Sequence, residues 1–299
     1  HLIPDYLKTL FHELDLVKQV IERYGLRIRS IYIGGGTPGI LTAEQIDLLM
    51  SRLITLVSNT KIKEITFEIG RPDTVTQEKL FLLKSFGVDR ISINTQSTND
   101  TVLKTIGRNH TSEQYFNSVD LANQIGFKVI NTDLIAGLSG ESEESFISGI
   151  NDVINSGVNN VTIHTLALKK SADIRHSKDA FSSTDSIDEY ISNSKNICIS
   201  HGFRPYYLYR QKYALGNHES IGYCKEMEYS HYNIAMMNEI ETVIGVGAGA
   251  TSRVICESNE NNHSHFENYK YPEEYIRDTS KMISSIQRIS EAISHSMNI

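Results

Sequence analysis

The sequence is poor in cysteine and has no tryptophan. Its 299 residues include three cysteines, Cys198, Cys224 and Cys256. Such a sparse and odd set is typical of reduced thiols in a cytoplasmic protein and argues against a disulfide framework. The cysteines are also too far apart in sequence to form a recognisable metal motif. We therefore expect each of them to be a small, buried apolar side chain.

Long apolar runs and an excess of positive charge are also missing. No stretch approaches the roughly 18 apolar residues of a membrane span, and residues 1–12 lack the pattern of a signal peptide. Lys and Arg number 29 against 36 Asp and Glu, which gives a net charge of −7. Nucleic acids and anionic membranes bind broad cationic faces, so we expect neither as a partner. An anionic small molecule held by a few local cations is still compatible with this charge.

Helices alternate with short apolar strands through the first 170 residues. Such alternation is typical of right-handed crossovers in a parallel sheet and predicts an α/β fold, either part of a barrel or an open doubly wound sheet. The strands are predicted to begin near residues 29, 63, 89, 128 and 160. Helical spacing of apolar residues predicts helices over residues 4–24, 42–56, 76–86, 100–106, 112–125 and 141–155.

The alternation stops near residue 175, so we expect one domain over residues 1–175 and a second over 176–299. Ten of the fifteen tyrosines lie beyond residue 200. In this second part the pattern predicts strands over 206–209 and 242–255, a polar loop over 257–265 and a closing helix over 271–295.

A glycine-rich segment, Gly34-Gly-Gly-Thr-Pro-Gly39, follows the first predicted strand. It matches the G-x-G-x-x-G pattern of dinucleotide-binding folds, but in those folds the helix opens within the motif. Here a capping box over residues 42–45 delays the helix, and the nearest acidic residue at a strand end, Glu68, lies 34 residues after Gly34. The alternatives are a tight turn without a ligand, or a bare backbone that binds an amine or carboxylate at a strand's carboxyl end.

Polar residues stand at nearly every predicted strand end, where α/β barrels bind their ligands. They are Thr37, Glu68, Asn94 with Gln96, Asp133, and His164. Each one alone could simply satisfy a backbone turn, but five such ends together favour a ligand site. Arg108 lies just past a predicted helix end, where it is either a solvated charge or a guanidinium that pairs with a carboxylate or a ribose.

These segments, taken in order, resemble radical S-adenosylmethionine (SAM) enzymes. More narrowly they are similar to the oxygen-independent coproporphyrinogen III oxidase (coproporphyrinogen dehydrogenase) group of the HemN and HemZ type. The resemblance covers about residues 29–255 and rests on segments 33–39, 68–74, 91–96, 106–111 and 133–138, with the later runs 205–212, 216–223 and 245–250 similar to the HemZ branch.

The resemblance implies a partial (β/α)6 TIM-like barrel over residues 1–175, with an α+β domain over 176–299 that covers the substrate. It also implies SAM and a [4Fe–4S] cluster as cofactors. The residues implied to bind SAM are the backbone of Gly34, Gly35, Gly36, Thr37 and Pro38, with Glu68, at the methionine amine; Arg108 at its carboxylate; Gln96 and Asp133 at the ribose; and Ala167 near the adenine.

The sequence departs from the family at the cluster. The family holds it with CxxxCxxC in a loop after the first barrel strand, and that strand and loop would precede His1. No cysteine of this chain can replace those ligands, so we expect the 299-residue chain alone to be inactive. Two smaller departures are Thr95 and Ser139, where the family usually has proline.

For the intact protein the resemblance implies a cytoplasmic enzyme of haem biosynthesis that oxidatively decarboxylates the propionates of coproporphyrinogen III to vinyl groups, giving protoporphyrinogen IX. Its partners would be this anionic tetrapyrrole and a reductant for the cluster. Tyrosines of residues 206–213, Tyr209 among them, would pack on the macrocycle, unless they are ordinary core residues. Candidate cations for the carboxylates are Lys169, Lys170, Arg175, Arg204, Arg210 and Lys212.

Two other functions remain open at this point. One is a non-catalytic carrier of haem or porphyrin, related to the oxidases, in which His164, His218 or Tyr213 is an axial ligand. The other is a barrel lyase that uses no SAM, although no lysine or metal cluster stands out at the strand ends to support it.

Overall fold

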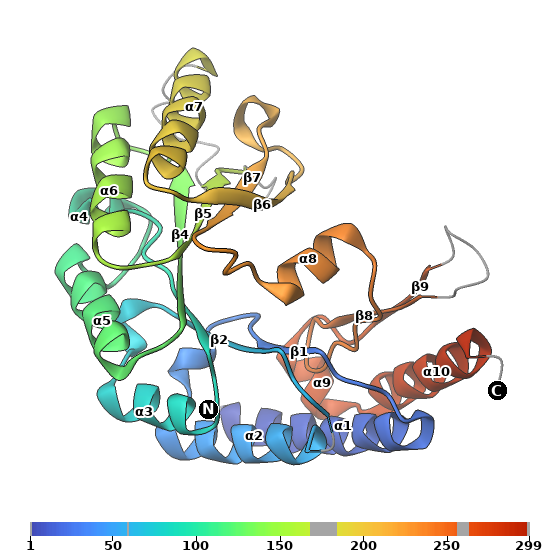
Figure 1. Cartoon of the computed structure of the whole chain (residues 1–299). Coiled ribbons are helices and arrows are strands. Elements are labelled where there is room, and N and C mark those ends of the chain that lie inside the picture. The colour runs from blue at the N-terminus through green and yellow to red at the C-terminus, as the bar shows by residue number, and fades with distance from the viewer. Residues whose placement is uncertain (1, 59, 168–183, 256–262, 298–299) are drawn as a thin grey trace. The chain divides into compact units, whose positions relative to one another are not determined.

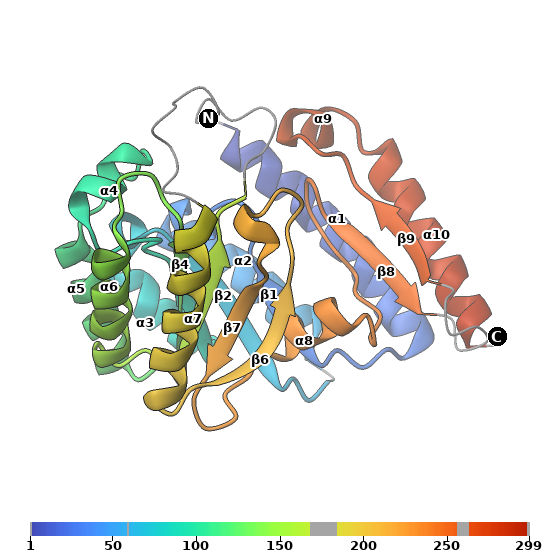
Figure 2. The ribbon, with the colours of Figure 1, turned by 90° about the horizontal axis from the view of Figure 1, so that it is seen from above.

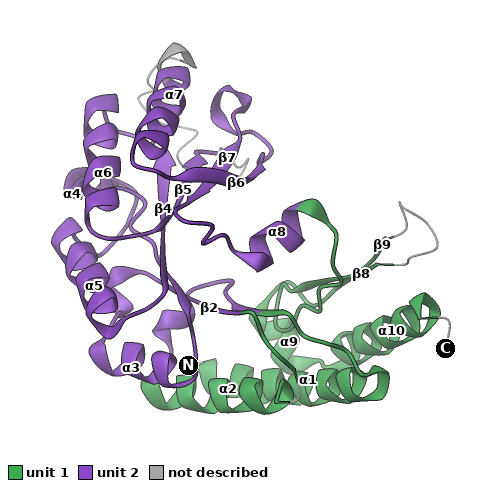
Figure 3. Cartoon of the chain, viewed as in Figure 1, with its two compact units in different colours: residues 1–30, 43–63, 238–299 green, residues 31–42, 64–237 purple. Residues whose placement is uncertain are grey.

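The structure, a computed structural model, describes residues 2–58, 60–167, 184–255 and 263–297 (Figure 1). Its contacts divide the chain into two compact units (Figure 3). Unit 1 comprises His1–Ser30, Ala43–Lys63 and Asn238–Ile299, and unit 2 comprises Ile31–Thr42 and Glu64–Met237. These units do not follow a single cut in the sequence, and the functional boundary expected between residues 175 and 176 stays a prediction.

Unit 2 is built on one seven-stranded sheet with the order β1-β2-β3-β4-β5-β7-β6. β2 to β5 pair in parallel, each with the next strand along the chain. A doubly wound sheet reverses its strand order at a switch point, and this sheet does not. The predicted α/β partial barrel is therefore confirmed. The strands are β1 (Ser30–Ile33), β2 (Glu64–Gly70), β3 (Arg90–Ile93), β4 (Val129–Ala136), β5 (Asn160–Thr165), β6 (Arg204–Tyr209) and β7 (Ser220–Cys224).

The helices of unit 2 lie mainly along the outer face of this sheet (Figures 1 and 2). Apolar side chains that point to the helices, such as Phe67, Ile91 and Val161, are completely buried, which makes the helix–sheet layer the core of this unit. The helices are α3 (Gln77–Ser85), α4 (Asp100–Thr105), α5 (Ser112–Ile125), α6 (Glu143–Asn155), α7 (Thr184–Ser200) and α8 (His231–Asn238). The helices and strands predicted for residues 1–166 are confirmed to within two residues at each end.

The strand predicted over residues 206–209 is confirmed as β6, but it continues the barrel sheet instead of starting a different kind of element. β7 pairs antiparallel with both β5 and β6, so β6 runs in the same direction as β5. Arg204 and Asn160 are therefore at the amino ends of their strands, whereas Tyr209 is at the carboxyl end, on the same edge of the sheet as the carboxyl ends of β2 to β5. α7, β7 and α8 were not expected from the sequence.

Unit 1 packs α1 (Ile3–Tyr24) and α2 (Ala43–Leu56) with the hairpin β8 (Thr251–Ile255) and β9 (His263–Glu267) and with helices α9 (Pro272–Arg277) and α10 (Ser280–Ser296). Its core includes Val17, Val254 and Ile289. The Glu13 carboxylate, 2% exposed, accepts hydrogen bonds from the Gly247 amide at 2.7 Å and the Tyr275 phenol at 2.6 Å.

Three expectations for the end of the chain are wrong in part. Only Thr251–Ile255 of the predicted strand 242–255 is a strand, because Gly247 and Gly249 have φ values of 104° and 73° and form a loop. The predicted helix 271–295 is split, because Asp278 is extended and accepts the Ser280 amide at 2.9 Å. His263 to His265 of the predicted loop belong to β9, and residues 257–262 lie outside the described part.

Two sequence expectations about thiols and membranes can also be compared with the structure. Cys198 and Cys224 are buried as expected, and burial raises the pKa of both thiols, that of Cys198 to about 12. Cys256 falls outside the described residues. Among the helices that the structure describes, none has the length and apolar character needed to cross a membrane.

Candidate functional site

The glycine-rich segment follows β1 at the carboxyl edge of the unit 2 sheet. Gly34, Gly35 and Gly36 are exposed, and a Cβ on Gly35 or Gly36 would meet nothing within 4 Å. A single 3₁₀ turn, Pro38–Ile40, separates them from α2. The helix therefore starts after the motif, which agrees with the rejection of a dinucleotide-binding loop. The open peptide groups can approach a ligand closely.

Glu68, near the carboxyl end of β2, lies against the glycine segment. A Cβ on Gly34 would be 2.8 Å from Glu68 Oε2 and 2.2 Å from the Tyr32 ring, so a larger residue here would displace one of these side chains. The Tyr32 phenol donates to Glu68 Oε2 at 2.9 Å. Burial raises the pKa of Glu68, the Tyr32 phenol opposes that rise, and the nearby Asp133 carboxylate adds to it.

Gln96 follows β3 with a φ of 74°, a left-handed conformation that is uncommon outside glycine. Its amide N–H donates to the Asp133 carbonyl at 3.0 Å, and its carbonyl accepts the Ile135 amide at 2.9 Å. These bonds extend the β3–β4 ladder and hold the strained residue in place. Such strain is often found at ligand sites. Within the described residues the Gln96 side-chain amide makes no hydrogen bond.

Asp133 points to the inner side of β4, where every second residue is only half-buried. Its carboxylate accepts a hydrogen bond from Asn131 Nδ2 at 3.0 Å and lies 3.5 Å from His164 Nε2. Burial raises the pKa of Asp133, but the His164 imidazole and the other hydrogen bonds outweigh this and lower it. The carboxylate is therefore ionised at neutral pH, and its side chain is still 22% exposed.

His164 connects Asp133 to the tyrosines of β6. Its Nδ1 lies 2.8 Å from the Tyr209 hydroxyl. A proton on Nε2 would face Asp133, which leaves Nδ1 to accept from the phenol. The result is a continuous chain of polar contacts from β4 through β5 to β6.

Arg108 follows α4 and is half-buried. Its guanidinium makes no hydrogen bond or ion pair with any residue in the described part of the chain. Burial lowers its pKa, and the positive charge of Arg71 lowers it further, while Arg71 itself pairs with Asp73 at 3.2 Å. A half-buried cation beside another cation is suited to an anionic ligand.

Ala167 lies just beyond β5, where it forms an isolated bridge with Ala214. The structure places the glycine segment, Gln96 and Ala167 just beyond strands of one sheet, Glu68 near the end of β2, and Asp133 within β4, three residues before its end. Their individual roles as ligand contacts stay predictions.

The tyrosines of β6 reach across β7 toward β5. A bulge after Pro205 changes the register, and the hydroxyls of Tyr206, Tyr207 and Tyr209 contact Asn160, Thr162 and His164 on β5 at 3.1, 3.1 and 2.8 Å. A Cβ on Gly222 would be 1.8 Å from the Tyr207 ring, so this glycine lets Tyr207 cross β7. These phenols line the inner face of the sheet.

The candidate substrate cations are less uniform than expected. Arg210 is 54% exposed and pairs with Glu219, so its charge is already partnered. Lys212 lies over the Tyr213 ring, with Nζ 5.4 Å from the ring centre. Arg204 is at the opposite, amino edge of the sheet and is not near the others, which corrects that expectation. Lys169, Lys170 and Arg175 lie outside the described residues.

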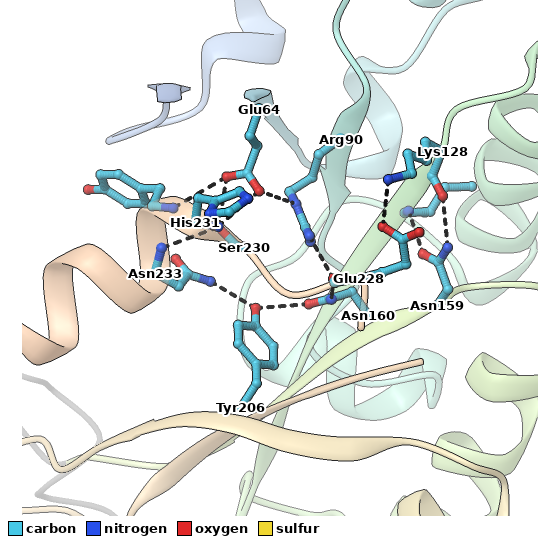
Figure 4. Close-up of polar contacts among 12 residues, drawn as sticks. Glu64, Arg90, Lys128, Asn159, Asn160, Tyr206, Glu228, Ser230, His231 and Asn233 are labelled. Carbon is cyan, nitrogen blue, oxygen red and sulfur yellow. Dashed lines mark hydrogen bonds and ion pairs between the residues drawn. The ribbon is translucent and has the colours of Figure 1, made fainter. Parts of the chain in front are cut away.

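A second polar cluster at the amino edge of the sheet was missed from the sequence (Figure 4). Glu64 starts β2 and Arg90 starts β3, and their side chains pair at 3.4 Å while 6% and 5% exposed. Arg90 also donates to the Glu228 carbonyl at 2.7 Å, as does Asn160 at 2.8 Å. Polar residues at strand starts look the same in sequence as those at strand ends, so no local signal marks this cluster.

The donor set of the carboxyl edge can be compared with the cofactors that the resemblance implies. SAM carries an ammonium, a carboxylate and a ribose diol, and the edge offers carboxylates, an unpaired guanidinium and an open glycine backbone. SAM therefore fits. The cluster does not fit this chain, because two of its three cysteines are buried with raised pKa values and the described residues contain no group of metal ligands.

Comparisons with known proteins agree with this geometry. Residues 5–153 match the model of the Radical SAM superfamily. The chain is 37% identical over 276 residues to the oxygen-independent coproporphyrinogen-III oxidase-like protein HemZ of Bacillus subtilis, an alignment that covers 91% of this chain and 55% of HemZ. It is 32% identical over 167 residues to the heme chaperone HemW of Lactococcus lactis, which covers 56% of this chain and 42% of HemW.

Among solved structures, the coproporphyrinogen III oxidase HemN of Escherichia coli shares the fold, with a TM-score of 0.71 at 19% identity over 94% of this chain and 63% of that chain. The chain spans about half the length of the curated relatives it matches. By its sequence and its fold, the chain belongs to the radical SAM superfamily, in the group of HemN and HemZ type proteins, a family that uses SAM and a [4Fe–4S] cluster.

Proposed function

We propose that this chain is the SAM-binding part of an oxidoreductase that converts propionate side chains of coproporphyrinogen III to vinyl groups, giving protoporphyrinogen IX in haem biosynthesis. The observation that carries the proposal is the chain of contacts Asp133–His164–Tyr209. It joins the strand that would hold the cofactor to the strand that would meet the substrate. The relatives named coproporphyrinogen oxidase support the substrate class.

Four polar residues and the glycine backbone would hold SAM. The Glu68 carboxylate and the peptide groups of Gly34–Pro38 would bind the ammonium group, and the Arg108 guanidinium would pair with the carboxylate. Asp133 and Gln96 would accept and donate hydrogen bonds at the ribose hydroxyls, with the adenine near Ala167. When bound and reduced, SAM supplies the oxidant that removes a hydrogen atom from an unactivated C–H bond.

The tyrosine face of β6 would orient the tetrapyrrole. Tyr209 presents a ring edge to His164, and the Tyr207 and Tyr209 rings are parallel at 6.4 Å, a surface suited to a flat macrocycle. Arg210 would exchange Glu219 for a substrate carboxylate, and Lys212 would add a second cation. Because Asp133 is ionised, it would hold His164 in the orientation in which Nδ1 accepts from Tyr209.

The test is anaerobic turnover by the protein as the native cell makes it. Its intact mass and its amino-terminal sequence would be determined first, to show whether CxxxCxxC precedes His1. With SAM, a reductant, coproporphyrinogen III and an electron acceptor that takes the second electron of each decarboxylation, we expect loss of carbon dioxide and the appearance of vinyl groups. Cleavage of SAM without any change in the tetrapyrrole would contradict the proposed substrate.

A second function, a carrier of haem, is favoured by the relatives named heme chaperone HemW. Both ring nitrogens of His164 are engaged, which makes it a poor axial ligand. His218 is 25% exposed with Nε2 2.5 Å from Asp188 Oδ1, and Tyr213 is 44% exposed. A Soret band on haem titration that disappears in His218→Ala, without turnover of coproporphyrinogen III, would favour this function.

A further inference from the structure

Two stacked tyrosines lie next to Glu68, outside the set of residues that would contact SAM. Tyr32 comes from β1 and Tyr232 from α8, positions 200 residues apart in sequence. Their ring centres are 4.2 Å apart and their planes differ by 16°. The Tyr32 phenol donates to Glu68 Oε2 at 2.9 Å. The stacked pair therefore contacts one oxygen of a carboxylate at the candidate site, through the Tyr32 phenol.

The Glu68 side chain has little room to change its conformation. On one side, Gly34 is so close that a Cβ would be 2.8 Å from Oε2. On the other, the Tyr32 ring is backed by Tyr232, so it cannot rotate away without breaking the stack. The titratable groups that face Glu68 are Tyr32 from β1, Asp133 from β4, His164 from β5 and Tyr232 from α8.

The backbone of Tyr232 is in turn held by the cluster at the amino edge. Glu64 accepts hydrogen bonds from the Ser230 hydroxyl at 3.0 Å and from the His231 amide at 3.0 Å (Figure 4). It also accepts the Tyr232 amide at 3.4 Å. These bonds satisfy N–H groups at the start of α8. Arg90 forms an ion pair with the same Glu64 carboxylate. The hydrogen bonds to Glu64 therefore connect the first turn of α8, which includes Tyr232, to the start of β2.

We propose that Tyr32 and Tyr232 are positioning residues that orient the Glu68 carboxylate toward an ammonium group of the ligand. Tyr32 fixes the carboxylate by its hydrogen bond, and Tyr232 fixes Tyr32 by stacking. Both glutamates involved lie on β2, since Glu64 accepts the Tyr232 amide and Glu68 accepts the Tyr32 phenol. The inference deepens the proposed function and rests on it, because the ammonium group is that of SAM.

The test is the Glu68 titration and the pH profile of SAM binding in Tyr32→Phe. A hydrogen bond to a charged group corresponds to about one to two pKa units. Carbon NMR of carboxyl-labelled glutamate, with the Glu68 signal assigned by Glu68→Gln, would show a Glu68 pKa that is higher by that amount in Tyr32→Phe. The pH below which SAM binding weakens would rise by the same amount. A residue that only stabilises the fold would not move this profile.

Variants of Tyr232 test the stacking step. Tyr232→Phe keeps the ring and should bind SAM as the wild type does, whereas Tyr232→Ala should bind about two- to tenfold more weakly. Tyr24→Phe is the matched control, since it removes a phenol bonded to Ser290 in the other unit at 3.1 Å, and it should leave both readouts unchanged. Circular dichroism would verify that each variant is folded.

The outcomes separate the two proposals. An unchanged Glu68 pKa in Tyr32→Phe, or equal SAM affinities of Tyr232→Ala and Tyr232→Phe, overturns the positioning role while the proposed function stands. No SAM binding by the wild type at any pH overturns the proposed function and the positioning role together.

Discussion

The two edges of the unit 2 sheet carry polar clusters of opposite character. At the amino edge, Glu64 and Arg90 are almost fully buried and form an ion pair with each other. At the carboxyl edge, Asp133 is 22% exposed and Arg108 has no partner among the described residues. The charges of the first cluster are paired with each other, whereas the second leaves a cation without a partner among the described residues. This difference, more than polarity as such, distinguishes a cluster that holds the fold from one that is ready for a ligand.

The amino edge should therefore respond most strongly in folding. Arg90→Met leaves the buried Glu64 carboxylate without its cation, so we expect a loss of about 3–5 kcal/mol in the free energy of unfolding. Urea denaturation followed by circular dichroism measures it. Lys128→Met is the control, because Lys128 is 65% exposed in its pair with Glu228 and such pairs contribute roughly 0–1 kcal/mol. Equal losses in the two variants would remove the contrast between buried and exposed pairs.

A buried carboxyl behind the carboxyl edge should make stability depend on pH. Glu141 is 7% exposed, its Oε1 accepts the Ser97 hydroxyl, and its Oε2 is buried without a hydrogen-bond partner. Burial raises the pKa of Glu141 to about 7, so the folded chain holds this proton more tightly than the unfolded chain. Its contribution to stability is present below the unfolded pKa and is lost as the pH rises through about 7.

Glu141→Gln measures that contribution. Between pH 5 and pH 8 the wild type should lose on the order of 2 kcal/mol of unfolding free energy relative to the variant. Urea denaturation at the two pH values provides the comparison. Parallel changes in both proteins would show that another group carries the pH dependence.

The carboxyl edge should respond in binding and hardly in folding. Arg108→Ala is expected to weaken SAM binding by about 1–3 kcal/mol, the scale of a hydrogen bond between charged groups. Its unfolding free energy should stay the same or rise slightly, because the repulsion with Arg71 is relieved. Calorimetry and urea denaturation on the same preparation separate the two effects. Unchanged SAM affinity would refute the role assigned to Arg108.

Smaller still is the effect expected from Gly222, midway between the edges. Gly222→Ala places a methyl group in the Tyr207 ring, and the overpacking should cost roughly 1–2 kcal/mol of unfolding free energy. In the Tyr207→Ala background, adding Gly222→Ala should not lower the unfolding free energy further, because the ring that the methyl group would meet is absent. If the losses of unfolding free energy of the two single variants simply add in the double variant, the contact between Gly222 and Tyr207 is not the reason for the glycine.

Most of the barrel could be predicted from sequence because its signals are local. Apolar strands, caps and helix-closing glycines define β2 to β5 and their helices within a few residues each. The loop around Gly247 was predicted as a strand because its apolar letters hide the positive φ values and the buried Glu13 that binds it. Likewise, the helical spacing of residues 271–295 continues through Asp278, where the chain is extended.

The sequence predicted the candidate site residues on and after the strands, but it did not predict the residues that hold them in place. Glu68 and Asp133 lie in predicted strands and Gln96 follows one, which is visible in sequence. The stack of Tyr32 on Tyr232 and the pairing of Glu64 with Arg90 depend on residues far apart in sequence, and no pattern within either segment marks them.

Calorimetric titration of SAM into the wild-type chain and into Asp133→Asn tests the central claim most directly, namely that the carboxyl edge binds one adenosyl amino acid. We expect a single site in the wild type and an affinity about five- to a hundredfold lower in the variant, since the amide loses the charge that would bind the ribose hydroxyls. Equal affinities, or no binding by the wild type, would contradict the account.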